Sequence, residues 1–125
     1  MSDFAAFVAQ TAARPWEWGR MDCAMWLAQW CVWRWRVNPL LAWQDRYTTE
    51  AEAESIISDE GGLVALLRRQ MTFAVEKARP DDGDVGVIVV SGQPTCAIRA
   101  GDKWAFRTPA GIGMVPATAL AVWGD

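Results

Sequence analysis

The period of the hydrophobic pattern changes once along the chain. Up to about residue 71 the apolar positions recur every three or four residues, which predicts helices. After a polar stretch at 79–84 the chain consists of short β-branched runs separated by Gly-rich turns, which predicts strands. The predicted helices span 4–13, 23–36, 49–58 and 63–71, and the predicted strands span 85–90, 95–100, 103–108 and 111–115. Val122 and Trp123 are expected to dock back on the core.

This order of elements predicts the fold class. Helices followed by an antiparallel meander are typical of an α+β domain, here N-terminal helices packed on a small C-terminal antiparallel sheet. A chain of 125 residues suits one domain, so residues 1–125 are interpreted as a single unit. The helix predicted at 23–36 begins after Asp22, a good N-cap, and is apolar around most of its circumference. Such a helix is buried or shared with a neighbour.

Tryptophan is the unusual feature of the composition. The chain has nine Trp, one Tyr and four Phe. Trp supplies much buried area, but it is also enriched at the centres of protein interfaces. Trp26 and Trp30 share the apolar stripe of the predicted helix and are assigned to the core. Four others lie off that stripe or in loops, and we expect some of them to be exposed and to contact a partner chain: Trp16, Trp33, Trp35 and Trp43.

Charge and cysteine content exclude several classes of function. The net charge is −3 with both signs interspersed, so no basic face predicts nucleic-acid binding. No apolar run reaches the roughly 20 residues of a membrane span. The N-terminus lacks the features of a signal peptide, which predicts synthesis in a cytoplasm. Three cysteines and no histidine predict no disulfide framework, no metal site and no cofactor.

The candidate chemistry is a cysteine at a predicted helix start. The partial positive charge of a helix N-terminus favours the Cys23 thiolate, whereas the neighbouring Asp22 opposes it. With no histidine, no obvious group can accept the thiol proton and return it to a leaving amine. Asp84 or Glu17 could act as the base only with a raised pKa. The structural alternative is that Cys23 is a small, well-packed residue.

Three segments, taken together, resemble a known family. Residues 16–24 read Trp-Glu-Trp-Gly-Arg-Met-Asp-Cys-Ala, residues 82–85 read Asp-Gly-Asp-Val, and residues 95–98 read Thr-Cys-Ala-Ile. This layout resembles the NlpC-like cell-wall peptidases, which are papain-like cysteine hydrolases. The resemblance implies a papain-like fold with Cys23 at the nucleophile position. It also places Thr95 where the catalytic His belongs, and Arg107 near the third polar position. In a register shifted by one residue, Cys96 would face Cys23 instead, as a disulfide or redox pair.

Residues 14–123 also resemble a group of short phage and prophage proteins. The shared features are Trp-Gly-x-x-Asp-Cys at 18–23, Arg-Tyr-Thr-Thr at 46–49, Gly-Gly-Leu at 61–63 and Gly-Asp-Val at 83–85. The resemblance implies a structural protein of the phage tail tip, in the baseplate or hub, made in the host cytoplasm and bound to other tail-tip proteins. One alternative is a peptidoglycan hydrolase that uses Cys23 during genome entry. Another is an assembly chaperone that never enters the particle.

Overall fold

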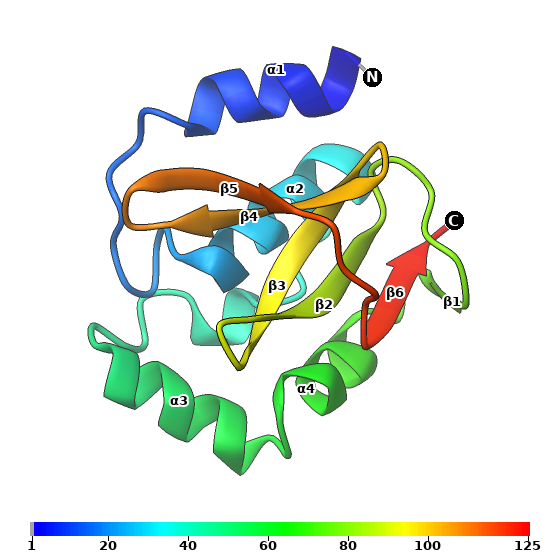
Figure 1. Ribbon diagram of the computed structural model, residues 1–125. Helices are drawn as coiled ribbons and strands as arrows, with labels where there is room; N and C mark the ends of the chain where they lie inside the picture. Colours follow the sequence, from blue (N-terminus) through cyan, green and yellow to red (C-terminus); the bar gives the residue numbers. More distant parts are fainter. Residues whose placement is uncertain (1) are drawn as a thin grey trace.

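The computed structural model describes residues 2–125 and confirms the α+β fold class (Figure 1). The predicted domain also included Met1, which lies outside the described residues. The helical elements come first in the chain, and each of the four predicted helices is found within two residues of its expected ends. They are α1 (Ser2–Thr11), α2 (Cys23–Trp35), the short 3-10 helix η1 (Leu41–Trp43), α3 (Glu50–Asp59) and α4 (Leu63–Gln70).

Polar caps and glycines set the ends of these helices. The Asp22 carboxylate accepts a hydrogen bond from the Met25 backbone N–H at 2.8 Å and so caps α2, as predicted. Thr49 caps α3 in the same way, by accepting from the Glu52 N–H at 3.1 Å. Between α3 and α4, Gly61 and Gly62 have φ of 88° and 105°, a conformation that disfavours residues with a Cβ.

Six antiparallel strands form one sheet in the order β1-β6-β2-β3-β4-β5. The four predicted strands are present, although the second begins two residues early because its hairpin turn is only Ser91-Gly92. Two short strands were not predicted: β1, which pairs only with β6, and β6 itself, which lies between β1 and β2. The strands are β1 (Val75–Lys77), β2 (Val85–Val90), β3 (Gln93–Ala100), β4 (Lys103–Thr108), β5 (Gly111–Val115) and β6 (Ala121–Gly124).

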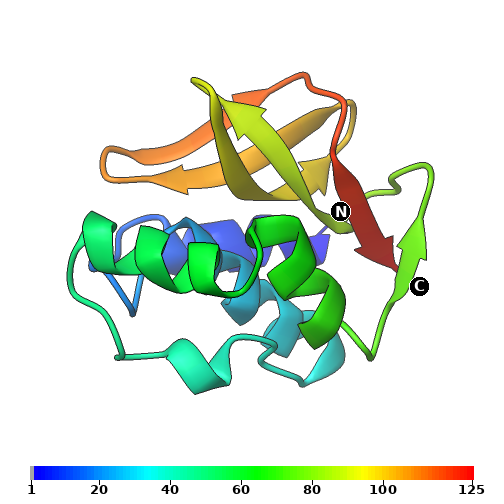
Figure 2. The ribbon, with the colours of Figure 1, turned by 90° about the horizontal axis from the view of Figure 1, so that it is seen from below.

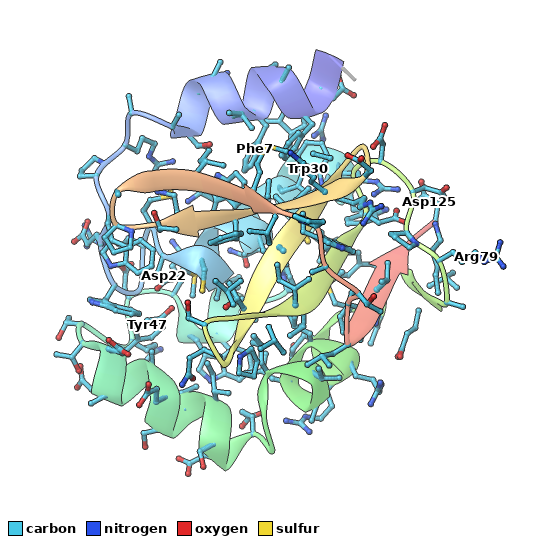
Figure 3. The ribbon with its side chains drawn as sticks, in the orientation of Figure 1. Phe7, Asp22, Trp30, Tyr47, Arg79 and Asp125 are labelled. Carbon is cyan, nitrogen blue, oxygen red and sulfur yellow. The ribbon has the colours of Figure 1, made fainter. Side chains whose placement is uncertain are left out.

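The main core lies between the helices and one face of the curved sheet (Figure 2). Trp26 and Leu27 of α2 are fully buried there, and α2 packs mainly on β3. α1 closes this core with an aromatic contact between Phe7 and Trp30, whose ring centroids are 5.3 Å apart (Figure 3). A smaller apolar cluster fills the other face of the sheet and consists of Ile88, Ala97, Trp104, Phe106 and Val122.

None of the helices within residues 2–125 has both the length and the apolar character that crossing a bilayer requires.

Candidate functional site

Cys23 is the first residue of α2, the longest helix of the described chain, as the sequence predicted. It is half-buried and lies in a groove of about 380 Å³ between the start of α2, α3 and the beginning of β3. The tip of the β2–β3 hairpin points toward α3 at this place (Figure 1). The thiol was expected to face the first predicted strand, β2, but it lies close to the Cys96 backbone in β3. That difference follows from the packing of α2, which rests mainly on β3.

The surroundings of Cys23 keep its thiol protonated. Burial, followed by the negative charge of Asp22, raises the pKa of Cys23 to about 11. The backbone N–H groups of Cys96, Ala24 and Cys23 itself act in the opposite direction, as expected at a helix N-terminus, but they are outweighed. At neutral pH the groove therefore contains a neutral thiol and not a thiolate.

A buried carboxylate next to Cys23 organises the surrounding backbone. Asp22 is 2% exposed and accepts three hydrogen bonds: from the Gly19 N–H at 2.9 Å, from the Met25 N–H at 2.8 Å and from the Tyr47 hydroxyl at 2.5 Å. Asp22 and Tyr47 lie on the same side of the molecule, above α3 (Figure 3). Burial and Asp22 raise the pKa of Tyr47, so its phenol stays a donor. The sequence predicted the Asp22 cap, but it placed Tyr47 only within the Arg-Tyr-Thr-Thr segment and did not predict its hydrogen bond to Asp22.

Thr95, at the predicted histidine position, lines the same groove as Cys23. Its hydroxyl donates to the Gln93 carbonyl at 3.0 Å, within its own strand. The register pairs Thr95 with Ile88 and Cys96 with Val87, and Cys96 and Val87 both belong to the core beneath the helices. Because side chains alternate along a strand, the residue of β3 that packs toward α2 is Cys96.

Cys96 therefore packs in the core beneath α2, whereas Thr95 lines the groove beside Cys23. Cys23 and Cys96 are both free thiols, and no disulfide joins them. Burial raises the pKa of Cys96, and the nearby Cys23 and Asp22 raise it further. Neither thiol can serve as a base for the other under these conditions.

Arg107 does not belong to the groove, contrary to its predicted place near the third polar position. It is 4% exposed, and its guanidinium donates to the carbonyls of Thr11 and Thr108, each at 3.1 Å, and to the carbonyl of Arg14. Burial and the charge of Arg14 lower its pKa from the ordinary value. Through these hydrogen bonds Arg107, in β4, holds the C-terminal end of α1 against the sheet.

The two carboxylates considered as alternative bases are also elsewhere. Asp84 is fully buried and accepts hydrogen bonds from Lys77 Nζ at 2.6 Å, Arg34 Nη1 at 3.2 Å and the Asp81 N–H at 2.8 Å. Glu17 is exposed and lies 3.9 Å from Arg20 Nε. Neither lines the groove that contains Cys23.

The four tryptophans predicted at an interface are half-buried, and none of them is exposed. Trp33 packs edge-on against Phe7 at a centroid distance of 5.7 Å, and Trp35 packs against Phe73 at 5.5 Å. Trp43 lines a small apolar cavity under α3, and Trp16 meets Trp18 at 5.0 Å. The expected exposure is therefore wrong, because Trp33, Trp35 and Trp43 pack against the core and Trp16 packs on Trp18. Their role at an interface stays a prediction.

Within residues 2–125, the structure contains no group of three or more Cys, Asp or Glu side chains that could hold a metal ion.

The family of the chain follows from a match over almost its whole length. A family model described as a domain of unknown function, DUF6950, matches residues 1–124, and the chain belongs to this family. No curated protein and no solved structure matches the chain.

Proposed function

We propose that this member of the DUF6950 family is a structural protein of a phage tail tip, in the baseplate or hub, built on a degenerate NlpC-like scaffold that no longer cleaves peptide bonds. Its partners would be other tail-tip proteins, and it would be made in the host cytoplasm before it enters the virion. The phage assignment rests on the sequence motifs given above. The proposed lack of catalysis rests on the geometry around Cys23.

One observation carries the second part of the proposal: the thiol of Cys23 lies in a groove whose lining contains neither an imidazole nor an amine that could accept its proton. With a pKa of about 11, only about one thiol in ten thousand is ionised at pH 7. A cysteine hydrolase needs a base to form the thiolate and an acid to protonate the leaving amine. Thr95 provides neither function, and Arg107 is held at the end of α1. The remaining ionisable groups of the groove are carboxyl groups and the Tyr47 phenol.

A cell-wall digestion assay tests this part directly. The purified protein, its Cys23→Ala variant and its Thr95→His variant would be incubated with peptidoglycan at neutral pH, and released stem peptides would be measured by mass spectrometry. We expect no release by the wild type or by Cys23→Ala. Release that disappears in Cys23→Ala would reject the proposal and favour the alternative, a peptidoglycan hydrolase acting during genome entry. The half-buried position of Cys23 at a helix start, in contact with the groove, is the observation that supports this alternative.

Analysis of purified particles tests the structural role. We expect the protein in virions at a fixed ratio to other tail proteins after density-gradient purification. An assembly chaperone would be present in the infected-cell lysate and absent from the particles, which would contradict the proposal.

A further inference from the structure

The groove that contains Cys23 has features that a vanished catalytic site alone does not explain. Its volume of about 380 Å³ falls within the range of about 300–1,000 Å³ that is usual for ligand sites. One wall is a single face of α3, formed by Glu50, Ala53, Glu54 and Ile57, which follow helical spacing. The opposite wall is the start of β3 at 93–95.

The charged side chains that line this groove are all acidic. Its lining contains carboxyl groups and no Lys or Arg. Asp22 is satisfied by its three hydrogen bonds, but Glu50 and Glu54 are exposed and form no ion pair or hydrogen bond with any residue of the described chain. The helix that carries them, α3, has four acidic residues and no basic one.

Helix stability accounts for a negative charge at Glu50 but not at Glu54. Glu50 lies in the first turn of α3, where a negative charge is favoured by the helix dipole. Glu54 lies one turn later, outside that region, and repels Glu50 at a spacing of four residues. A positive charge between these two side chains would remove the repulsion.

The apolar part of the groove suits a chain segment more than a free ion. Trp18 is half-buried and lines the groove, and its ring is held by an edge-on contact with Trp16 at 5.0 Å. An aromatic face of this kind binds the cationic head of a Lys or Arg side chain and covers its aliphatic stem. Ile57 and Pro94 extend the apolar surface on the two walls.

We propose that this groove binds a segment of a partner protein that carries basic and apolar residues, with a Lys or Arg side chain placed between Glu50 and Glu54 and against Trp18. The inference rests on the proposed structural function, which requires a partner, and it identifies the chemistry of the contact. This contact is separate from the one predicted at Trp33, Trp35 and Trp43, which do not line the groove. The Cys23 thiol contributes a small neutral surface at the floor of the groove.

A peptide titration followed by NMR tests the proposal. The probe is the capped hexapeptide Gly-Leu-Lys-Ala-Lys-Gly, and its control has Glu in place of both Lys. We expect the basic peptide to shift the Trp18 indole signal and the α3 amides, and the acidic peptide to leave them unchanged. The double variant Glu50→Gln/Glu54→Gln should weaken binding of the basic peptide by about tenfold or more.

A matched variant separates local from overall charge. Asp59→Asn/Asp102→Asn also removes two carboxylates, but these residues do not line the groove and form no ion pair within the described chain. We expect this variant to change binding by less than about twofold. Equal weakening by both variants would overturn the proposal, as would the absence of shifts at Trp18 and α3 up to about 1 mM peptide. Tighter binding of purified peptidoglycan stem peptides than of the basic peptide would also overturn it, since the occupant would then be cell wall.

The two proposals fail in different ways. If the protein is absent from virions but the basic peptide binds at α3, the tail-tip function is wrong and the groove chemistry stands. If the protein is present in virions and Glu50→Gln/Glu54→Gln is incorporated as well as the wild type, the groove inference is wrong and the function stands.

Discussion

At the scale of single residues, Asp22 has two opposing effects on the start of α2. Its carboxylate caps the helix and binds Tyr47, which satisfies donors that would otherwise be buried without a partner. Burial is the largest cause of the raised pKa of the adjacent Cys23, and the charge of Asp22 raises that pKa further. A helix N-terminus ordinarily lowers the pKa of a cysteine, and here the carboxylate and burial outweigh that effect. The residue that stabilises the helix therefore adds to the effect of burial in making the first cysteine of α2 a poor nucleophile.

The rate of alkylation by iodoacetamide measures how far the pKa of Cys23 is raised. Because the pKa of Cys23 is about 11 instead of the ordinary 9.0, the thiolate fraction at pH 7 is about 100-fold smaller than that of an unperturbed cysteine. We expect the rate of labelling to be slowed accordingly and to rise about tenfold per pH unit until about pH 11. Cys23→Ala should remain unlabelled, because Cys31 and Cys96 are fully buried. Rapid labelling at pH 7 with no further rise above pH 8 would show that the thiolate is stabilised.

At the scale of elements, α1 is attached to the rest of the molecule through two kinds of contact. Its aromatic residues Phe4 and Phe7 pack on Trp26 and Trp30 of α2. Its C-terminal end is held by Arg107, whose positive charge lies where the helix dipole favours a cation. Arg107 therefore has a structural role at a position that the sequence resemblance placed near the active site.

Replacing Arg107 tests this attachment. Arg107→Met keeps the apolar stem but removes the side-chain donor to the Arg14 carbonyl and one of the two donors to the Thr11 carbonyl, which also accepts from the Arg14 N–H. We expect a loss of about 2 kcal/mol in the free energy of unfolding. Urea denaturation measures that loss, and hydrogen exchange should show faster opening of α1. Arg79, which is exposed and extends away from the fold in Figure 3, gives the control Arg79→Met, with an expected change below about 0.5 kcal/mol. An equal effect of both substitutions would refute the assigned role.

Local sequence patterns predicted the elements that depend on residues close together in the sequence. The helices and the β2–β5 meander follow from apolar period, caps and tight turns, and Asp22 and Thr49 were recognisable as N-caps. The strands β1 and β6 are three and four residues long, and their pairing joins segments that are far apart in the sequence. No local pattern encodes such a pairing.

The candidate site was predictable only in part for the same reason. Cys23 was placed correctly on its helix, because an N-cap and a helix start are local features. The choice between Thr95 and Cys96 depended on the strand register, and a shift of one residue moves a side chain to the other face. The groove itself arises where α3 approaches β3, which is a tertiary contact.

At the scale of the whole molecule, the distribution of titratable groups determines how stability depends on pH. The chain has no histidine, whose side chain would titrate near neutral pH. Hydrogen bonds from Lys77, Arg68 and Arg34 lower the pKa of Asp81, Glu76 and Asp125, respectively. A carboxyl group with a lowered pKa in the folded state stabilises the fold above its unfolded pKa, and this contribution is lost as the pH falls.

The carboxyl groups lose their stabilising effect as the pH falls, whereas the buried cysteines lose theirs as the pH rises. Burial raises the pKa of Cys23 to about 11 and that of Cys31 to about 12, so the folded state favours the protonated thiols. Their contribution is complete below the ordinary cysteine pKa of about 9 and is lost as the pH rises toward the folded values. We expect the urea midpoint to be flat between about pH 5 and 8 and to fall on both sides. A steep change near pH 6.5 would contradict this account.

The position of β6 between β1 and β2 has a consequence for the order in which the protein can fold during translation. The ribosome completes the helices and the β2–β5 meander before it adds residues 121–124, so the strand that joins β1 to β2 arrives after all the others. Until then β1 has no neighbour, and residues Val85–Val87 of β2 present open backbone groups next to an apolar surface. A premature stop codon before residue 121 would leave this edge permanently open. Such a chain is expected to aggregate or to be degraded, even though it retains every residue of the groove around Cys23.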